Sequence, residues 1–389
     1  MELNVYAIII ILTLVGEYLL GLWADRLNLH TLGEGLPREF ADACDANAYA
    51  RSQEYTRTTT RFAMLRTSVM LFLILAFWSL GGFAALDAAV RSRGWGPIAT
   101  GLTYIAVIAV GRTLLGLPFS LYSTFVIEER FGFNRTTGRT FLLDMLKGLS
   151  LAVVVGGPIL ALVLWLFLWA GPAAWVWCWG ALTIITLAIQ FVAPTWIMPL
   201  FNKFEPLEEG ELRSAILDYA ARVHFPLQDV YVMDGSKRSS KANAFFTGFG
   251  RFKRIALFDT LIKRHTVPEL VAVLAHEIGH YKRKHIVKGM AIGILHTGAL
   301  LFLLSRFLGE AGLFAAFGIP QASVHAGLVL FGMLFAPVEF FLALGMNALS
   351  RKHEFEADRY AAETTGAPED LARALRTLSL DNLSHLTPH

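Results

Sequence analysis

Cysteine is scarce in this chain of 389 residues, where only Cys44 and Cys178 occur. Two cysteines cannot build a disulfide framework or a cysteine-based zinc site, so any metal must be held by histidine, aspartate or glutamate. Charged residues are also scarce at 17%, whereas 55% of the residues are hydrophobic. This balance excludes an ordinary soluble protein and indicates a membrane protein. The net charge of +3 is small, and we expect no nucleic-acid partner.

Long apolar runs define the predicted architecture. A membrane-spanning helix needs about 20 mainly apolar residues. Seven runs meet this requirement, at residues 5–23, 63–86, 97–121, 148–170, 173–201, 286–308 and 325–348. No basic residue precedes the first run, so we interpret it as a retained span rather than a signal peptide. The predicted fold class is an all-α polytopic membrane protein with seven transmembrane helices.

Lysine and arginine are unevenly distributed among the connections between these runs. Three connections hold only Arg91 and Arg93, whereas the others are rich in basic residues, at 24–62, 122–147, 202–285 and 349–389. The positive-inside rule then places the N-terminus outside and the C-terminus in the cytoplasm. The membrane would be a bacterial inner membrane or the endoplasmic reticulum.

Three ionisable residues fall inside the predicted spans: Glu17, Arg112 and Glu339. Such groups are costly in lipid, so they indicate a water-filled interior. Alternatively, Glu17 and Arg112 form a structural pair or lie near a membrane interface. The same residues are the reason to consider a transporter or channel.

The large connection after the fifth span contains the signals of a soluble domain. Residues 244–247 and 254–258 read as two strands of a small β-hairpin. Thr266 and Glu269 then have the spacing of a capping box that opens a helix. We divide the chain into a five-helix membrane region, 1–201, and a second domain, 202–389, that includes the last two spans.

The motif His276-Glu277-Ile278-Gly279-His280 lies on this predicted helix. Residues four apart share a helix face, so both imidazoles can ligate one ion. Zinc with three protein ligands keeps a position for water, and a neighbouring carboxylate can take the proton of that water. We therefore predict a zinc metalloprotease, with His276 and His280 as ligands and Glu277 as the catalytic base.

The third ligand is expected from the segment 350–358. Glu354 and Asp358 share a helix face, and the last two spans form a hairpin that returns this segment to the metal motif. We predict Glu354 as ligand and Asp358 as the group that orients a ligating imidazole. His353 and Glu356 are competitors on other faces.

Two further histidines follow the motif. Counted along one continuous helix, His285 lies opposite His276 and is expected in an interfacial cationic cluster. His296 is also expected to face away from zinc, lining a cavity or satisfied inside the bundle.

The first predicted strand offers a substrate site. Proteases of extended peptides commonly add the substrate to an exposed strand edge, and Asn243, Ala244 and Phe245 are the candidate edge. Asn243 would hydrogen-bond the substrate or the oxyanion. The alternative is a plain structural hairpin.

Together these motifs resemble the type 1 CAAX prenyl endopeptidases, which are integral-membrane zinc proteases. The resemblance covers most of the chain and includes further blocks at Glu129–Asn134, Met198–Asn202, Ser239–Phe245, Phe258–Leu261 and Asp381–Ser384. It implies a seven-helix barrel around a hydrated chamber, with a zincin-like domain that carries the hairpin. It also implies one zinc per chain on His276, His280 and Glu354, with Glu277 as base and Asn243 beside the substrate.

The implied reaction removes the last three residues of prenylated proteins, and some family members clear misfolded or stalled chains. The expected partners are a peptide or prenylated protein substrate and the lipid bilayer. The family continues past Asp381–Ser384 into a His-Pro element that assists at the metal. Because this chain stops at His389, we expect reduced or absent turnover. The rival interpretations are a heat-shock-type membrane protease without prenyl specificity, a transporter or channel, and a catalytically silent scaffold.

Overall fold

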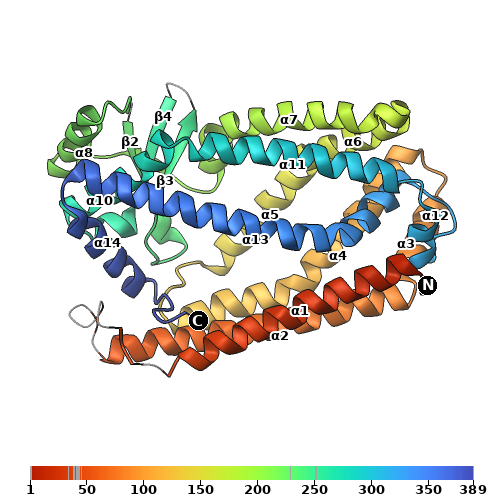
Figure 1. The fold of residues 1–389 in the computed structure, drawn as a ribbon, viewed down its shortest axis with the longest axis horizontal. Coiled ribbons are helices and arrows are strands. Elements are labelled where there is room, and N and C mark those ends of the chain that lie inside the picture. Colours follow the sequence, from red (N-terminus) through yellow and green to blue (C-terminus); the bar gives the residue numbers. More distant parts are fainter. Residues whose placement is uncertain are drawn as a thin grey trace.

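Seven helices long and apolar enough to span a membrane are present in the computed structural model (Figure 1). The structure describes residues 2–33, 35–37, 40, 44, 46–227, 229–249 and 252–388, and only the backbone at 244–249 and 252–254. The spans are Val5–Thr31, Ala46–Ser79, Pro97–Glu128, Gly138–Trp169, Gly171–Leu200, His285–Phe307 and Val324–Thr365. All seven predicted spans are thereby confirmed.

Several spans combine two or more helical segments. The main α-helices are α1 (Val5–Thr31), α2 (Ala46–Ser79), α4 (Pro97–Tyr122), α5 (Gly138–Leu151), α6 (Gly157–Trp169), α7 (Ala174–Val192), α11 (His285–Phe307) and α13 (Val324–Thr365). Short π-helical turns extend α4 and α7 and join α5 to α6. Helix α13 runs through Pro337, which is tolerated because neighbouring helices can satisfy the freed backbone group.

The second predicted span, 63–86, crosses a real break in the helix. Helix α2 ends at Ser79, Gly81 adopts a left-handed conformation with φ 74°, and α3 (Gly82–Arg91) begins. The ring of Phe77 packs directly onto Gly82, where a Cβ would clash. Two consecutive glycines thus allow the chain to turn inside an apolar run.

The spans form a closed ring of contacts. Helix α1 contacts α2, which meets the π-helical turn that extends α4, and contacts continue from α4 through α6, α7, α11 and α13 back to α1. In the most apolar stretch of each span, only 6% to 22% of the residues are buried inside the protein. Most of these side chains therefore face outward or into the interior of the ring. The ring agrees with the implied barrel, and the hydrated chamber remains a prediction.

One end of the ring is closed by aromatic packing. Trp78 stacks on Phe317 at 4.4 Å between ring centroids, and Phe83 meets Phe317 edge-on at 5.2 Å. The short helix α12 (Ala311–Ala316) adds apolar residues to this cluster. Figure 1 shows α3, α12 and the N-terminus together at this end, far from the β-sheet.

A sheet of four strands lies at the other end. The strands are β1 (Phe204–Pro206), β2 (Asp229–Met233), β3 (Ala244–Phe249) and β4 (Phe252–Phe258), in the order β1-β2-β4-β3. The antiparallel pair β3–β4 confirms the predicted hairpin. The sheet is larger than predicted, because β2 pairs in parallel with β4 and β1 is antiparallel to β2.

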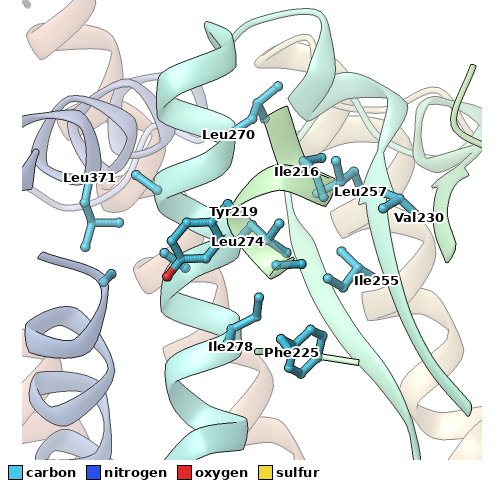
Figure 2. Packing of buried hydrophobic residues seen from close by; sticks show 14 of the residues in the cluster. Ile216, Tyr219, Phe225, Val230, Ile255, Leu257, Leu270, Leu274, Ile278 and Leu371 are labelled. Carbon is cyan, nitrogen blue, oxygen red and sulfur yellow. The ribbon is translucent and has the colours of Figure 1, made fainter. Parts of the chain in front are cut away.

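Helices α8 (Glu211–Arg222), α10 (Val267–Lys282) and α14 (Pro368–Asp381) pack with this sheet. The short helix α9 (Asp259–Ile262) follows β4. Figure 2 shows Ile216, Leu257, Leu274 and Ile278 meeting in the core between these elements, and all are at most 1% exposed. This core fixes α10, the helix that carries the metal motif.

Arg238 ties this domain to the membrane region. Its guanidinium donates to both carboxylate oxygens of Asp144 at 2.7 and 2.9 Å, and to the Phe201 carbonyl at 2.7 Å. A bidentate pair of this kind fixes orientation as well as distance. The end of the fifth span is therefore held beside the fourth.

Candidate metal centre

Helix α10 begins with the predicted capping box. The Glu269 carboxylate accepts a hydrogen bond from the Thr266 backbone N–H at 2.8 Å, and the Thr266 side chain caps the N–H of Glu269. Leu270, Leu274 and Ile278 turn one face of the helix into the core (Figure 2). The two histidines of the motif are partly buried.

Gly279 allows α10 to approach α13 closely. A Cβ at this position would lie 3.1 Å from both the Cα and the carbonyl oxygen of Ala357. A larger residue would therefore push the two helices apart. This contact brings the segment that bears Glu354 and Asp358 against the metal motif, as the hairpin argument predicted.

Three potential ligands converge between these helices. Atoms of His276, His280 and Glu354 all lie within 4.8 Å of one another, and this is the one such group among the described residues. His276 Nε2 is 3.1 Å from His280 Nε2 and 3.4 Å from Glu354 Oε2. His280 Nε2 is 3.6 Å from the same carboxylate oxygen. The two Nε2 atoms and the carboxylate thus face a common point.

Asp358 controls the proton of His276. Its Oδ1 lies 2.8 Å from His276 Nδ1, so this nitrogen donates and Nε2 keeps its lone pair. Burial works to lower the pKa of His276, but the hydrogen bond and charge of Asp358 outweigh it and raise the pKa. For His280, burial and the neighbouring His276 lower the pKa. The two rings therefore differ in proton affinity although they share one helix face.

The structure contradicts the position predicted for His285. It is only 5% exposed, and its Nδ1 lies 3.0 Å from His280 Nδ1. The count along one continuous helix fails because Lys284 is left-handed, with φ 57°, and separates α10 from α11. The turn brings the first residue of α11 back toward the motif, so His285 is buried against His280 rather than placed in an interfacial cationic cluster.

His353 and Glu356 both contact His285. Glu356 Oε2 lies 2.9 Å from His285 Nε2, and the His353 ring stacks on His285 at 3.9 Å. Neither belongs to the convergent ligand group. His296 lies further along α11, with Nε2 3.0 Å from Glu339 Oε1 on α13. This contact accounts for one of the ionisable residues predicted within the spans.

Glu277 lies beside the ligands on α10. It is partly buried, and its charge contributes to raising the pKa of His276. Among the described residues, Glu17 and Arg112 form no ion pair, and the Arg112 side chain is exposed.

Asn243 is exposed and immediately precedes β3, one of the two edge strands of the sheet. Its carbonyl accepts from the Phe258 N–H at 3.2 Å, and β3 also contacts α10. Strand residues Ala244 and Phe245 pair with β4, while their side chains lie outside the described part of the chain. The predicted substrate strand is therefore an edge strand next to the metal helix.

Asn382 positions this strand from the end of α14. Its amide accepts from the Ala242 N–H at 3.1 Å and donates to the Ala242 carbonyl at 3.3 Å. The side chain thus mimics a strand partner just before Asn243. The residues lie 140 positions apart, so local sequence patterns give no signal for the contact.

The donor set suits a zinc ion. Two imidazole nitrogens and one carboxylate oxygen are typical of catalytic zinc sites, and an Nδ1 hydrogen bond to a carboxylate is the usual support for such a ligand. His276 has this support from Asp358 at 2.8 Å. The residues present therefore fit the metal.

Comparisons with known proteins agree with this arrangement. Residues 25–203 match the family "CAAX prenyl protease N-terminal, five membrane helices", and residues 206–389 match "Peptidase family M48". The probable CAAX prenyl protease 1 of Schizosaccharomyces pombe is 36% identical over 96% of this chain and 81% of its own length. The human CAAX prenyl protease 1 homolog is 33% identical over 90% of this chain and 83% of its own length.

A solved structure extends the similarity to the whole fold. The crystal structure of Ste24p from S. mikatae matches with a TM-score of 0.92 at 33% identity, covering 100% of this chain and 94% of that one. The M48 peptidase family implies a metal. With its seven spans and its convergent ligands, this chain belongs to the CAAX prenyl protease 1 family of multi-pass membrane metalloendopeptidases.

Proposed function

We propose that this protein is a zinc-dependent endopeptidase that removes the C-terminal tripeptide of prenylated CAAX proteins. The convergence of His276, His280 and Glu354 within 4.8 Å is the observation that carries the proposal. The names of the similar proteins supply the substrate class. One zinc ion per chain would be held by these three residues, with Asp358 orienting His276 through its 2.8 Å hydrogen bond.

Glu277 is the proposed general base. Zinc at this site would supply Lewis acidity for the attack of water on a peptide carbonyl. Glu277, next to His276 on α10, accepts the proton of that water and returns it to the leaving amine. Asn243 donates from its side-chain amide to the substrate or to the oxygen that gains negative charge.

The edge of β3 is the proposed peptide-binding element. In the sheet order β1-β2-β4-β3, only one edge of β3 pairs with a described strand. Main-chain hydrogen bonds to its other edge would hold an extended peptide independently of sequence. Asn243, Ala244 and Phe245 stand at the start of this strand, which contacts α10, and Asn382 fixes the preceding Ala242.

The proposed topology places this chemistry in the cytoplasm. The basic connections put the N-terminus outside and the C-terminus inside, in a bacterial inner membrane or the endoplasmic reticulum. We propose a five-helix membrane region at 1–201 and a peptidase domain at 202–389. The bilayer surrounds the spans, and the substrate's prenyl chain would reach the site from it.

The test compares farnesylated and unmodified peptides of the same CAAX sequence. Purified protein in lipid nanodiscs should cleave the farnesylated peptide before its last three residues and contain zinc. Glu354→Ala should lose both zinc and cleavage. Glu277→Gln should keep zinc but lose about 100-fold or more in rate, because only the base is removed.

Two outcomes would redirect the proposal. Equal cleavage of both peptides would indicate a membrane quality-control protease without prenyl specificity. Full cleavage by Glu277→Gln would show that another residue is the base.

A further inference from the structure

A chain of hydrogen bonds connects the second motif histidine to a third carboxylate on α13. His280 Nδ1 lies 3.0 Å from His285 Nδ1, and His285 Nε2 lies 2.9 Å from Glu356 Oε2. Each contact joins a different nitrogen of His285, so the ring bridges its two partners. The bridge is buried, with the His285 side chain only 4% exposed.

The acceptor at one end determines the proton positions. An ionised carboxylate can only accept, so a neutral His285 donates from Nε2 to Glu356. Its Nδ1 then has a lone pair and accepts from His280 Nδ1–H. This arrangement leaves His280 Nε2 without a proton, on the side that faces His276 Nε2 and Glu354.

The two motif histidines thus receive equivalent support by different routes. Asp358 reaches His276 directly, whereas Glu356 reaches His280 through His285. The route needs an intermediary because Glu356 lies on a different face of α13 from Glu354 and Asp358. The left-handed Lys284 provides the intermediary by turning the start of α11 back to the site.

We propose that His285 and Glu356 are positioning residues that fix the tautomer and orientation of His280 for metal binding. The inference rests on the proposed zinc site. His353 stacks on the His285 ring with an interplanar angle of 10° and keeps its plane in place. His285 itself is not a ligand, since the convergent group of the described residues does not include it.

The experiment measures zinc affinity by competition with a chelator, on apo protein in nanodiscs. His285→Phe keeps a ring against His353 but has no nitrogen, and should weaken zinc binding about 10–100-fold. His285→Asn loses the ring but places an amide oxygen near the former Nδ1, and should recover most of that loss. The visible spectrum of the cobalt-substituted protein should change in His285→Phe and return toward wild type in His285→Asn.

Thermal stability separates positioning from packing. A purely structural role predicts that His285→Phe is the more stable and the better zinc binder of the two variants, because it keeps the stacked ring. Positioning predicts the opposite order for zinc affinity. Glu356→Ala should weaken zinc binding in the same direction without changing a buried ring, and Glu356→Gln should do so less because its amide oxygen still accepts. His353→Phe is the matched control and should bind zinc as wild type does.

Failure of the positioning role can be told apart from failure of the proposed function. If wild-type protein binds no zinc, the proposed function fails and the positioning role fails with it. If wild type binds zinc while His285→Phe and Glu356→Ala bind it within twofold of wild type, only the positioning role is overturned.

Discussion

Two histidine–carboxylate pairs lie near opposite ends of α13, about 50 Å apart along a helix of 1.5 Å rise per residue. At one end His325 Nε2 lies 2.7 Å from Asp87 Oδ1. At the other, His276 Nδ1 lies 2.8 Å from Asp358 Oδ1. The same pair of groups at nearly the same distance serves two purposes.

The difference lies in what surrounds each pair. Asp87 also accepts from Arg91 Nε at 2.7 Å, and Ser323 Oγ lies 3.2 Å from the same His325 nitrogen. Arg91 and Ser323 thus bond to polar atoms of the pair, whose two side chains are almost fully buried. At the metal end, Asp358 occupies Nδ1 and leaves Nε2 beside His280 and Glu354. The two pairs therefore differ in how the histidine is used: both polar partners of His325 meet its Nε2, whereas His276 is held at Nδ1 and presents Nε2 to His280 and Glu354.

The largest expected effect comes from removing Asp87 from its pair with His325. Asp87→Ala should destabilise the protein by about 3–5 kcal/mol, because Arg91 and His325 lose their buried acceptor. Chemical denaturation in detergent micelles would measure the change, and Asp87→Asn should cost less because it still accepts. Zinc content of the folded fraction should remain that of wild type. Zinc loss without a stability change would contradict a purely structural role for this end.

The second prediction tests the pair at the metal end. Asp358→Ala should weaken zinc binding about 10–100-fold, since His276 loses the acceptor that fixes its tautomer. That loss corresponds to about 1.4–2.8 kcal/mol. Chelator competition would measure it, with Asp358→Asn as the variant that retains an accepting oxygen. Unchanged affinity in Asp358→Ala would remove the distinction between the two pairs.

The grouping of His276, His280 and Glu354 could be predicted from the sequence because its geometry is largely local, while their role as metal ligands stays a prediction. Positions 276 and 280, and again 354 and 358, follow from four-residue spacing on single helices. The hairpin of the last two spans then brings the two segments together. The spans themselves follow from apolar length, although Gly81 broke one of them.

The failures arose where local periodicity stops. His285 was misplaced because Lys284, which is not glycine, adopts a left-handed conformation that no sequence rule signals. The pair of Asp87 and His325 joins residues 238 positions apart, so only the assembled bundle reveals it. Strands β1 and β2 were missed because they are short and β2 pairs with the distant β4.

The smallest expected effect comes from a change at Ser323, at the structural end of α13. Ser323 caps α13, accepting from the Ala326 N–H at 3.4 Å while its hydroxyl contacts His325. Ser323→Ala should cost about 1 kcal/mol of stability, the usual value for a lost N-cap, and Ser323→Gly only a few tenths. Denaturation midpoints would measure both, and zinc affinity should not change. If Ser323→Ala weakened zinc binding, α13 would transmit changes along its whole length, and the two ends could no longer be treated as independent.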